Sequence, residues 1–185
     1  MILLQKRFLQ TKGGIGMPNM QIRSVSCLST TEYKKDEIYF MWAYGWGLGS
    51  DVFVGTYNGG TQLREDRTAV LNREIIDDWS APPHGIMYGV LALIEEDFGE
   101  DFNRNMTSGY KLRQARRVEN YINSQIDAYN SLGHPIGITE LRTFLHDGIE
   151  RHKVNDIAIG TCPLIPGTHD IRGHEGHYQV VLVSV

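Results

Sequence analysis

The alternation of apolar and polar positions in the first half of the chain predicts a series of β-strands. Residues 20–29 alternate loosely, and residues 34–47 combine aromatic and β-branched side chains with flanking turn glycines, which is typical of a strand. Residues 51–60 repeat this pattern and end in Asn-Gly-Gly, a turn signal. Residues 84–97 form a long apolar run that ends in acidic residues, as expected of a central strand.

A helical period follows, in which apolar residues recur three and four positions apart. From Ser108 to Leu132 this spacing places them on one face of a helix (Leu112, Ala115, Val118, Ile122, Ile126 and Tyr129). The sequence "GHPIG" then breaks the helix, and Thr139 is suited to cap a second, shorter helix (Leu141, Phe144, Leu145 and Ile149). The pattern predicts an amphipathic helical hairpin over about 108–151.

Strand-like sequence returns after the hairpin, in residues 154–165 and 177–185. The order of strands, helical hairpin and strands predicts a mostly-β fold, an antiparallel β-sandwich with an inserted helical hairpin, and excludes an alternating βαβ fold. We divide the chain into an N-terminal arm, 1–19, and a single sandwich domain, 20–185, and place the helical insertion at 104–152.

Composition narrows the class of protein. The chain has 185 residues, of which 41% are hydrophobic and 22% charged, as in a soluble globular domain that can bury its own core. The net charge of -4 argues against a nucleic-acid partner, which would call for a basic patch. No signal peptide and no apolar run near the ~18 residues of a membrane span is recognisable. We therefore expect a protein that is cytoplasmic or released by a non-classical route.

The N-terminal arm combines an apolar start with Lys6, Arg7 and Lys12. Chain ends are ordered only where they pack against something. We expect this arm to contact a neighbouring subunit, which would make the protein a homo-oligomer.

Acidic residues gather where the predicted strands begin and end. Asp36 and Glu37 open one strand, Asp97 and Asp101 follow the central strand, and Asp156 opens the strand after the hairpin. Ca²⁺ takes six to eight oxygen ligands, and carboxylates at converging strand ends can supply them. These five residues are the predicted calcium site. The alternative is an acidic rim that is simply solvated.

Four short stretches resemble a loosely defined group of small bacterial β-sandwich proteins: "VSCLSTTEYKKDEIYF", "VLALIEEDFGED", "VNDIAIGT" and "GHYQVVLVSV". Their layout is similar to calcium- and lipid-binding sandwich domains of the synaptotagmin type, in which an Asp-Asp-x-Ile-Gly turn is common. Here the corresponding stretch, Asn155 to Gly160, is one residue longer. The resemblance covers roughly residues 20–101 and 154–185. It implies the sandwich fold and favours calcium, and it implies no activity.

Three histidines, His169, His174 and His177, lie close together before the last strand. Zinc binds neutral imidazoles and needs a third or fourth ligand, which Asp170 or Glu175 could provide. The spacing matches neither two ligands one helical turn apart nor a tight knuckle, and glycines surround the histidines. We therefore interpret "THDIRGHEG" as a polar loop that leads into the last strand, with a zinc site as the alternative.

The two cysteines suggest two further hypotheses. Cys27 could act as the nucleophile of a cysteine hydrolase with His177 as its base, because "GHYQVVLVSV" is similar to the histidine strand of papain-like bacterial peptidases. Against this, Cys27 ends a strand-like run and does not start a helix, and no orienting Asp or Asn follows His177. Cys27 and Cys162 could also form a disulfide, although two buried thiols are the commoner outcome.

Together these patterns favour a non-enzymatic binding or self-assembly module that is stabilised by calcium. The first alternative is the Cys27/His177 hydrolase. The second is a toxin-like protein that uses the helical insertion to act on membranes. The mixed charges on the polar face of the long helix favour packing on the core over membrane contact.

Overall fold

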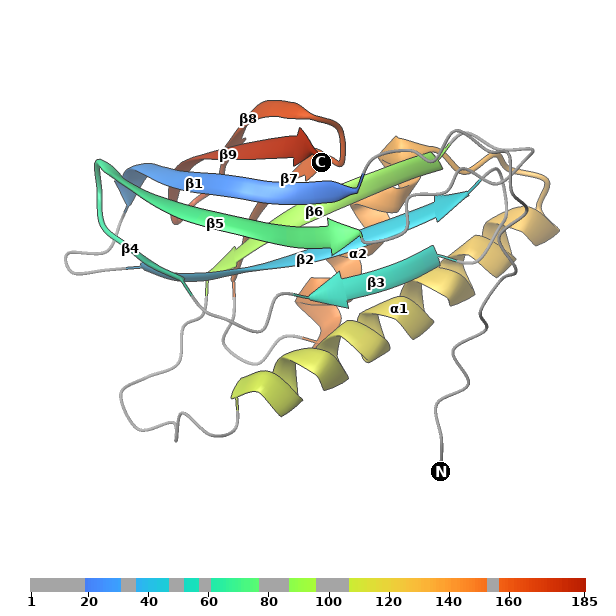
Figure 1. The fold of residues 1–185 in the computed structure, drawn as a ribbon. Helices are drawn as coiled ribbons and strands as arrows, with labels where there is room; N and C mark the ends of the chain where they lie inside the picture. The colour runs from blue at the N-terminus through green and yellow to red at the C-terminus, as the bar shows by residue number, and fades with distance from the viewer. Residues whose placement is uncertain are drawn as a thin grey trace.

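Two antiparallel β-sheets and a helical hairpin lie in three layers (Figure 1). The computed structural model describes residues 19–30, 36–46, 52–56, 61–76, 87–95, 107–152 and 157–185. The strands are β1 (Met20–Thr30), β2 (Asp36–Trp46), β3 (Val52–Thr56), β4 (Thr61–Leu63), β5 (Arg67–Ile76), β6 (Met87–Glu95), β7 (Ile157–Pro163), β8 (Gly167–Arg172) and β9 (Gly176–Ser184). The helices are α1 (Thr107–Ser131) and α2 (Ile138–His152).

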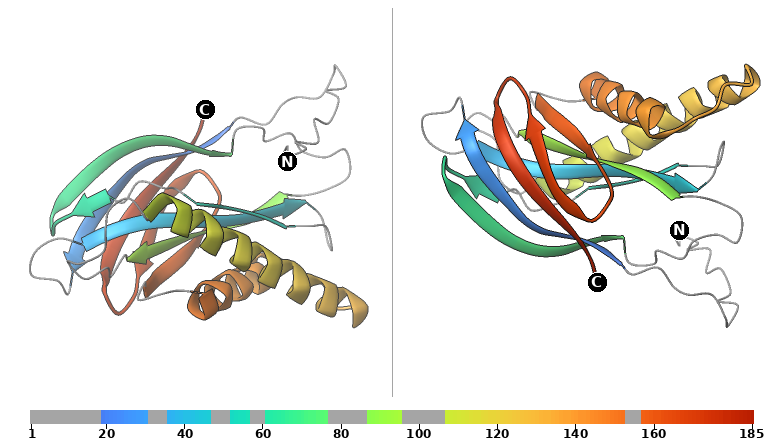
Figure 2. Two further views of the ribbon diagram at one scale, coloured as in Figure 1. Left: turned by 90° about the horizontal axis from the view of Figure 1, so that it is seen from below. Right: turned by 90° about the horizontal axis from the view of Figure 1, so that it is seen from above.

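One sheet, here called the outer sheet, has the strand order β5-β1-β9-β8. The other, the central sheet, has the order β3-β2-β6-β7, and β4 pairs with the first residues of β2. The helices cover the face of the central sheet that points away from the outer sheet (Figure 2). The predicted antiparallel sandwich with a helical insertion is confirmed, and the hairpin differs from the predicted 108–151 by one residue at each end.

The central sheet is buried on both faces, which explains its continuous apolar sequence. In β2, alternate side chains join two different cores: Ile38, Phe40 and Trp42 face the outer sheet, and Tyr39, Met41 and Ala43 face the helices. Successive side chains of a strand point to opposite faces, so a strand between two cores needs apolar residues at every position. β6 alternates in the same way, and its Leu91 and Leu93 face the outer sheet.

The second core uses the apolar stripes of both helices. Four residues of α1 and four of α2 are buried against the central sheet (Ala115, Val118, Ile122 and Ile126; Leu141, Phe144, Leu145 and Ile149). Near the turn that joins the two helices, the rings of Tyr129 and Phe144 meet edge to face, with centroids 5.0 Å apart. The helices therefore act as the third layer of the fold.

A bulge in β1 explains why its sequence alternates only loosely. Ile22 and Val25 are both buried, although they are three positions apart and strict alternation would place them on opposite faces. The register of β1 shifts between Ile22 and Ser24 against both of its neighbours, β5 and β9. The extra residue, Arg23, returns the following side chains to the core face.

The structure corrects one prediction in the last part of the chain. The stretch predicted as a polar loop, "THDIRGHEG", contains the edge strand β8, which pairs with β9 along its whole length. Only Ile171 of this strand is fully buried, while its other side chains are polar or lack a Cβ. An edge strand with a single core side chain carries too little hydrophobic alternation to be recognised from sequence.

Candidate functional site

Three strand ends of the central sheet lie side by side at the place where the acidic segments begin. Ile38, near the start of β2, pairs with Glu95 at the end of β6. Glu95 in turn pairs with Ile157, the first residue of β7. The sequence stretches that carry the predicted calcium ligands therefore leave or join one end of a single sheet.

Glu37 and Glu95 are the carboxylates that can be placed at this end. Glu37 accepts a hydrogen bond from the side-chain amide of Gln62, its backbone neighbour in β4. Glu95 is only 5% exposed. A carboxylate so far from water needs polar or cationic neighbours, because burial of an unpaired charge is costly.

The other predicted calcium ligands are placed only in part. Asp36 is the first residue of β2. Asp97, Asp101 and Asp156 lie outside the described residues, so calcium binding at this end stays a prediction. Within the described stretches, no three His, Cys, Asp or Glu side chains are grouped as a metal site would require.

The three histidines of the predicted zinc alternative make separate contacts. His169, on β8, has its Nε2 atom 2.8 Å from the carbonyl oxygen of Ile165. His174 is 96% exposed, and its Nδ1 atom lies 3.6 Å from Glu175 Oε1. His177, on β9, faces residues of β8. The structure does not bring these three imidazoles together around one point.

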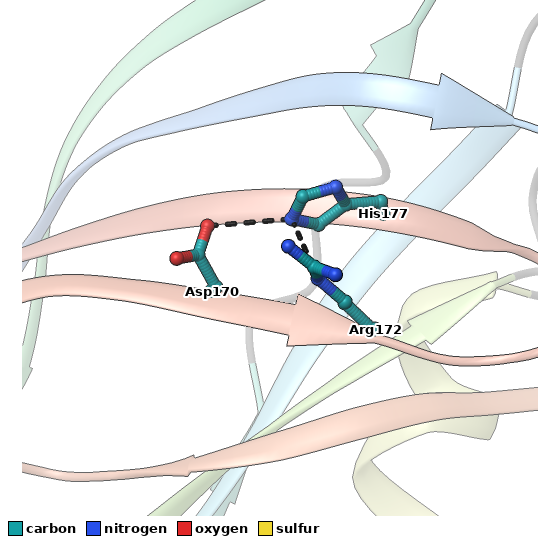
Figure 3. A network of polar contacts seen from close by, with 3 residues as sticks. All are labelled: Asp170, Arg172 and His177. Carbon is teal, nitrogen blue, oxygen red and sulfur yellow. Dashed lines mark hydrogen bonds and ion pairs between the residues drawn. The ribbon is translucent and has the colours of Figure 1, made fainter.

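His177 is the centre of a small polar network on the outer sheet (Figure 3). Its Nε2 atom lies 3.3 Å from Asp170 Oδ1 and 3.2 Å from the Nε–H group of Arg172. One ring nitrogen cannot donate to Asp170 and accept from Arg172 in the same protonation state. The imidazole therefore has two competing hydrogen-bond arrangements, one with each neighbour.

A row of hydrogen-bonding side chains continues from this network across the outer sheet. The backbone register aligns Thr68 of β5, Ser26 of β1, Gln179 of β9 and Asp170 of β8. The Ser26 and Thr68 hydroxyl oxygens lie 2.7 Å apart. Figure 1 shows no described helix or strand over this face of the sheet. In the sequence, a member of this row can be recognised only as a polar residue between buried ones. The sequence does not show which residues lie beside it on the neighbouring strands.

Two glycines in the histidine segment are required by close packing. Gly173 and Gly176 bound the turn between β8 and β9, and the Gly173 N–H donates to the Gly176 carbonyl oxygen over 3.0 Å. A Cβ atom on Gly173 would collide with the carbonyl oxygen of Ile159, and one on Gly176 would lie 2.7 Å from the carbonyl oxygen of Ser29. These glycines fix the turn against its neighbours.

The predicted pair of Cys27 and His177 is separated by the faces of the outer sheet. Cys27 is fully buried in the first core and pairs with Tyr178, whose side chain is also fully buried. His177 precedes Tyr178 in β9, so its side chain points to the opposite, outer face. The strand geometry therefore keeps the His177 imidazole away from the Cys27 thiol, whereas a Cys/His nucleophile needs the two side chains in contact.

Both cysteines are thiols and form no disulfide with each other. Burial raises the pKa of the Cys162 thiol to about 12, and the nearby charge of Arg142 lowers it by a smaller amount. A thiol in this environment stays protonated at neutral pH and is a poor nucleophile.

A shallow pocket of about 400 Å³ lies at the turn between the two helices, lined by Tyr129, Leu132, His134, Pro135 and Glu140. Its one carboxylate, Glu140, accepts a hydrogen bond of 2.8 Å from the Gly137 N–H at the start of α2. That contact caps the helix. The pocket offers mainly apolar contact.

The two helices leave no apolar stripe for the predicted membrane contact. Their apolar stripes are buried in the second core. Neither described helix has the length and apolarity that a membrane-crossing segment requires.

No protein-family model, no curated protein and no solved structure matches this chain. The resemblance to synaptotagmin-type sandwich domains therefore stays an expectation from the sequence.

Proposed function

We propose that the chain is a non-enzymatic binding or self-assembly module that Ca²⁺ stabilises at one end of the central sheet. The observation that carries this proposal is the pairing of Ile38 with Glu95 and of Glu95 with Ile157. It makes three acidic stretches of the sequence, around Asp36, Asp97 and Asp156, continuous with adjacent strand ends.

Calcium bound at this end of the central sheet would stabilise the folded state relative to the unfolded chain. The ligands come from distant parts of the sequence, so the unfolded chain offers no comparable site. The helical insertion follows β6 and precedes β7, so the same ion would fasten both ends of the insertion to the sheet. A ligand at about 100 times its Kd that binds only the folded state adds about 2.7 kcal/mol to the free energy of unfolding.

The outer sheet supplies a surface for the binding half of this proposal. The row Thr68, Ser26, Gln179 and Asp170 presents donors and acceptors on one face, and Arg172 adds a positive charge beside it. Interfaces between proteins that also exist apart are about as polar as ordinary protein surface. A polar sheet face of this kind suits a protein partner better than a small molecule, which needs a concave site.

Thermal unfolding in EDTA, in Ca²⁺ and in Mg²⁺ tests the calcium proposal. We expect saturating Ca²⁺ to raise the Tm by about 5–10 °C over EDTA, from the free energy above and the size of the chain. Asp97→Asn/Asp101→Asn should lose most of this shift. Glu74→Gln, an exposed substitution on β5, is the control and should keep it. An identical Tm of the unchanged chain in EDTA and in Ca²⁺ would contradict the proposal.

A further inference from the structure

Four arginines gather on the outward side of the helical hairpin, on the opposite side of the molecule from the outer sheet. Arg113, Arg116 and Arg117 belong to α1, and Arg151 lies in the last turn of α2. All four residues are exposed, and no described strand or helix covers this side of the hairpin (Figure 2). These four residues are here called the arginine cluster.

The three arginines of α1 occupy positions that the stability of a helix does not favour. Arg116 and Arg117 follow Arg113 by three and four positions, where like charges on a helix are neighbours and repel. The first turn of α1 contains no acidic residue that would offset them. In α2, by contrast, Glu140 lies in the first turn and Arg151 in the last, as the helix dipole favours. Helix stability therefore does not explain the charge pattern of α1.

Polar residues on another side of α1 serve the fold. The Val54 N–H donates to Glu119 Oε2 over 3.0 Å, and Asn123 exchanges two hydrogen bonds with the backbone of Val52. The carboxylate of Glu119 is thus directed at the edge of β3. Although it follows Arg117 by only two positions, it leaves the charge of the arginine cluster in place.

Gly148 allows the two helices to approach each other closely beside the arginine cluster. A Cβ atom on Gly148 would lie 3.0 Å from a methyl carbon of Val118 and 3.1 Å from the ring of Tyr121. Next to this contact, Arg151 Cζ lies 5.0 Å from the centre of the Tyr121 ring, which is a cation–π contact. Arg117 precedes Tyr121 by one helical turn, so arginines of both helices lie beside this ring.

Ion pairs within the described part of the chain do not cancel the charge of the arginine cluster. None of the four guanidinium groups forms an ion pair there. Two carboxylates of α2 are close to the cluster in sequence, Asp147 and Glu150. Asp147 Oδ1 lies 3.5 Å from His146 Nδ1. The outward side of the hairpin is therefore positive in a chain whose net charge is -4.

We propose that the arginine cluster is the binding surface for a partner protein, and that the partner contributes a short segment rich in Asp and Glu. A guanidinium group is planar and can donate two parallel hydrogen bonds to one carboxylate, so a carboxylate matches its geometry as well as its charge. Arg113 and Arg117 are about 6 Å apart along the helix axis. Alternate side chains of an extended peptide are about 6.6 Å apart and can follow this spacing.

A long polyanion fits this charge distribution less well than a short acidic segment. The net charge of -4 includes the four arginines, so the rest of the chain is more negative still. Charges act over about 8 Å at physiological salt, so a short segment meets mainly the arginine cluster. A nucleic acid or a membrane surface would extend over the negative remainder. A helix that lies on a membrane also presents an apolar stripe, and the stripe of α1 is buried.

Titration of the full chain into a fluorescein-labelled octaglutamate peptide tests this surface. Fluorescence anisotropy follows the binding, and the buffer contains EDTA. We expect saturable binding that weakens at least about tenfold between about 50 and 200 mM salt, because several charge pairs are screened together.

The decisive variant is Arg113→Gln/Arg117→Gln/Arg151→Gln, which removes charge from both helices. We expect it to bind the peptide about tenfold more weakly or worse, since each exposed charge pair adds a modest amount to the affinity. Arg113→Glu/Arg116→Glu covers the case in which loss of the contact between Arg151 and Tyr121 disturbs the helices. It leaves that contact intact and should abolish binding.

The matched control is Arg23→Gln/Arg64→Gln/Arg67→Gln, which removes the same charge from exposed positions in β1, before β5 and at its start. It should bind the peptide within about twofold of the unchanged chain, because these positions are more than a screening length from the hairpin. If the control loses as much affinity as the decisive variant, only the net charge matters and the proposal is wrong.

Two further probes present negative charge in other forms, an oligothymidylate of the same charge and vesicles of phosphatidylserine and phosphatidylcholine. Tighter binding of either probe than of the peptide would contradict an acidic protein segment as the partner. So would a folded chain that does not bind the peptide.

This inference deepens the binding half of the proposed function and rests on it, but it does not rest on calcium. Peptide binding in EDTA, with no effect of Ca²⁺ on the Tm, supports the arginine cluster and contradicts the calcium proposal. An effect of Ca²⁺ on the Tm without peptide binding gives the opposite result.

Discussion

The hydroxyl of Tyr39 in β2 donates a hydrogen bond of 2.8 Å to Gln114 Oε1 of α1, inside the core between the central sheet and the helices. It ties the two layers together through a polar contact in an otherwise apolar layer. The other end of the same amide, Nε2, has no hydrogen-bond partner among the described residues. The hydrogen-bonding capacity of the Gln114 amide is therefore only half satisfied, through its oxygen.

Removal of the Tyr39 hydroxyl should destabilise the protein. In Tyr39→Phe the whole Gln114 amide is left buried without this bond, and we expect the free energy of unfolding to fall by about 1–3 kcal/mol. Tyr39→Phe/Gln114→Met removes both polar groups and should recover most of the loss. Urea unfolding at fixed pH measures both. A double variant no more stable than Tyr39→Phe would show that this bond is not the cause.

Stability should fall at alkaline pH because of Cys162. Burial raises the pKa of this thiol to about 12 from its ordinary value of 9.0. Below pH 9 the thiol is protonated in both the folded and the unfolded chain. Between about pH 9 and pH 12 the unfolded chain loses the proton and the folded chain keeps it, so this group lowers the free energy of unfolding by up to about 1.4 kcal/mol per pH unit.

The variant Cys162→Ala isolates this effect from other groups that titrate in the same range, such as Tyr88, whose pKa burial also raises. Urea unfolding of both proteins through the alkaline range should give a shallower pH dependence for Cys162→Ala. Equal slopes in the two proteins would refute the assignment to Cys162.

Gly173 should not tolerate a side chain. A Cβ atom there would collide with the backbone oxygen of Ile159, which cannot move aside as a flexible side chain can. We expect Gly173→Ala to cost about 1–3 kcal/mol. The control is Gly137→Ala, where the nearest atom is the end of the Glu140 side chain, 3.3 Å away. Chemical unfolding compares them, and a larger loss in Gly137→Ala would be inconsistent with this packing.

The two arrangements of His177 should respond in opposite directions to loss of each neighbour. Arg172→Met removes the donor to Nε2, so the neutral imidazole should favour a proton on Nε2, shared with Asp170. Asp170→Ala should favour a proton on Nδ1. Ring ¹⁵N chemical shifts at a pH where the imidazole is neutral report the tautomer. Identical shifts in the two variants would mean that neither neighbour sets the proton position.

How far the sequence predicts this fold depends on how local each signal is. The helical hairpin was predicted almost to the residue, because a 3.6-residue period and the break at "GHPIG" are local signals. β2 was predicted as a strand from its aromatic and β-branched residues. That its alternate side chains serve two cores is a property of the three layers, which no local pattern reveals.

The polar sites are harder to predict because their residues meet only through contacts between strands and helices that are distant in sequence. The sequence marks Asp170 and His177 as candidate ligands but gives no sign of Arg172, because the three meet only through the pairing of β8 with β9. Glu119 and Asn123 look like ordinary residues of a helix surface until β3 lies beside them. The convergence of the acidic stretches stays a prediction, and the register of the central sheet shows only that the strand ends next to them, at Ile38, Glu95 and Ile157, are neighbours.

The pairing of β1 with β9 has a consequence for how the molecule folds. The two inner strands of the outer sheet come from opposite ends of the described chain, whereas β2, β3 and β6 of the central sheet are near one another in sequence. Contacts between distant segments form late, because a long loop must close first. We expect the central sheet with its helices to assemble before the outer sheet docks. Until then the face that carries Phe40, Leu91 and Leu93 has no cover, and this stage is the one most open to aggregation and most in need of a chaperone.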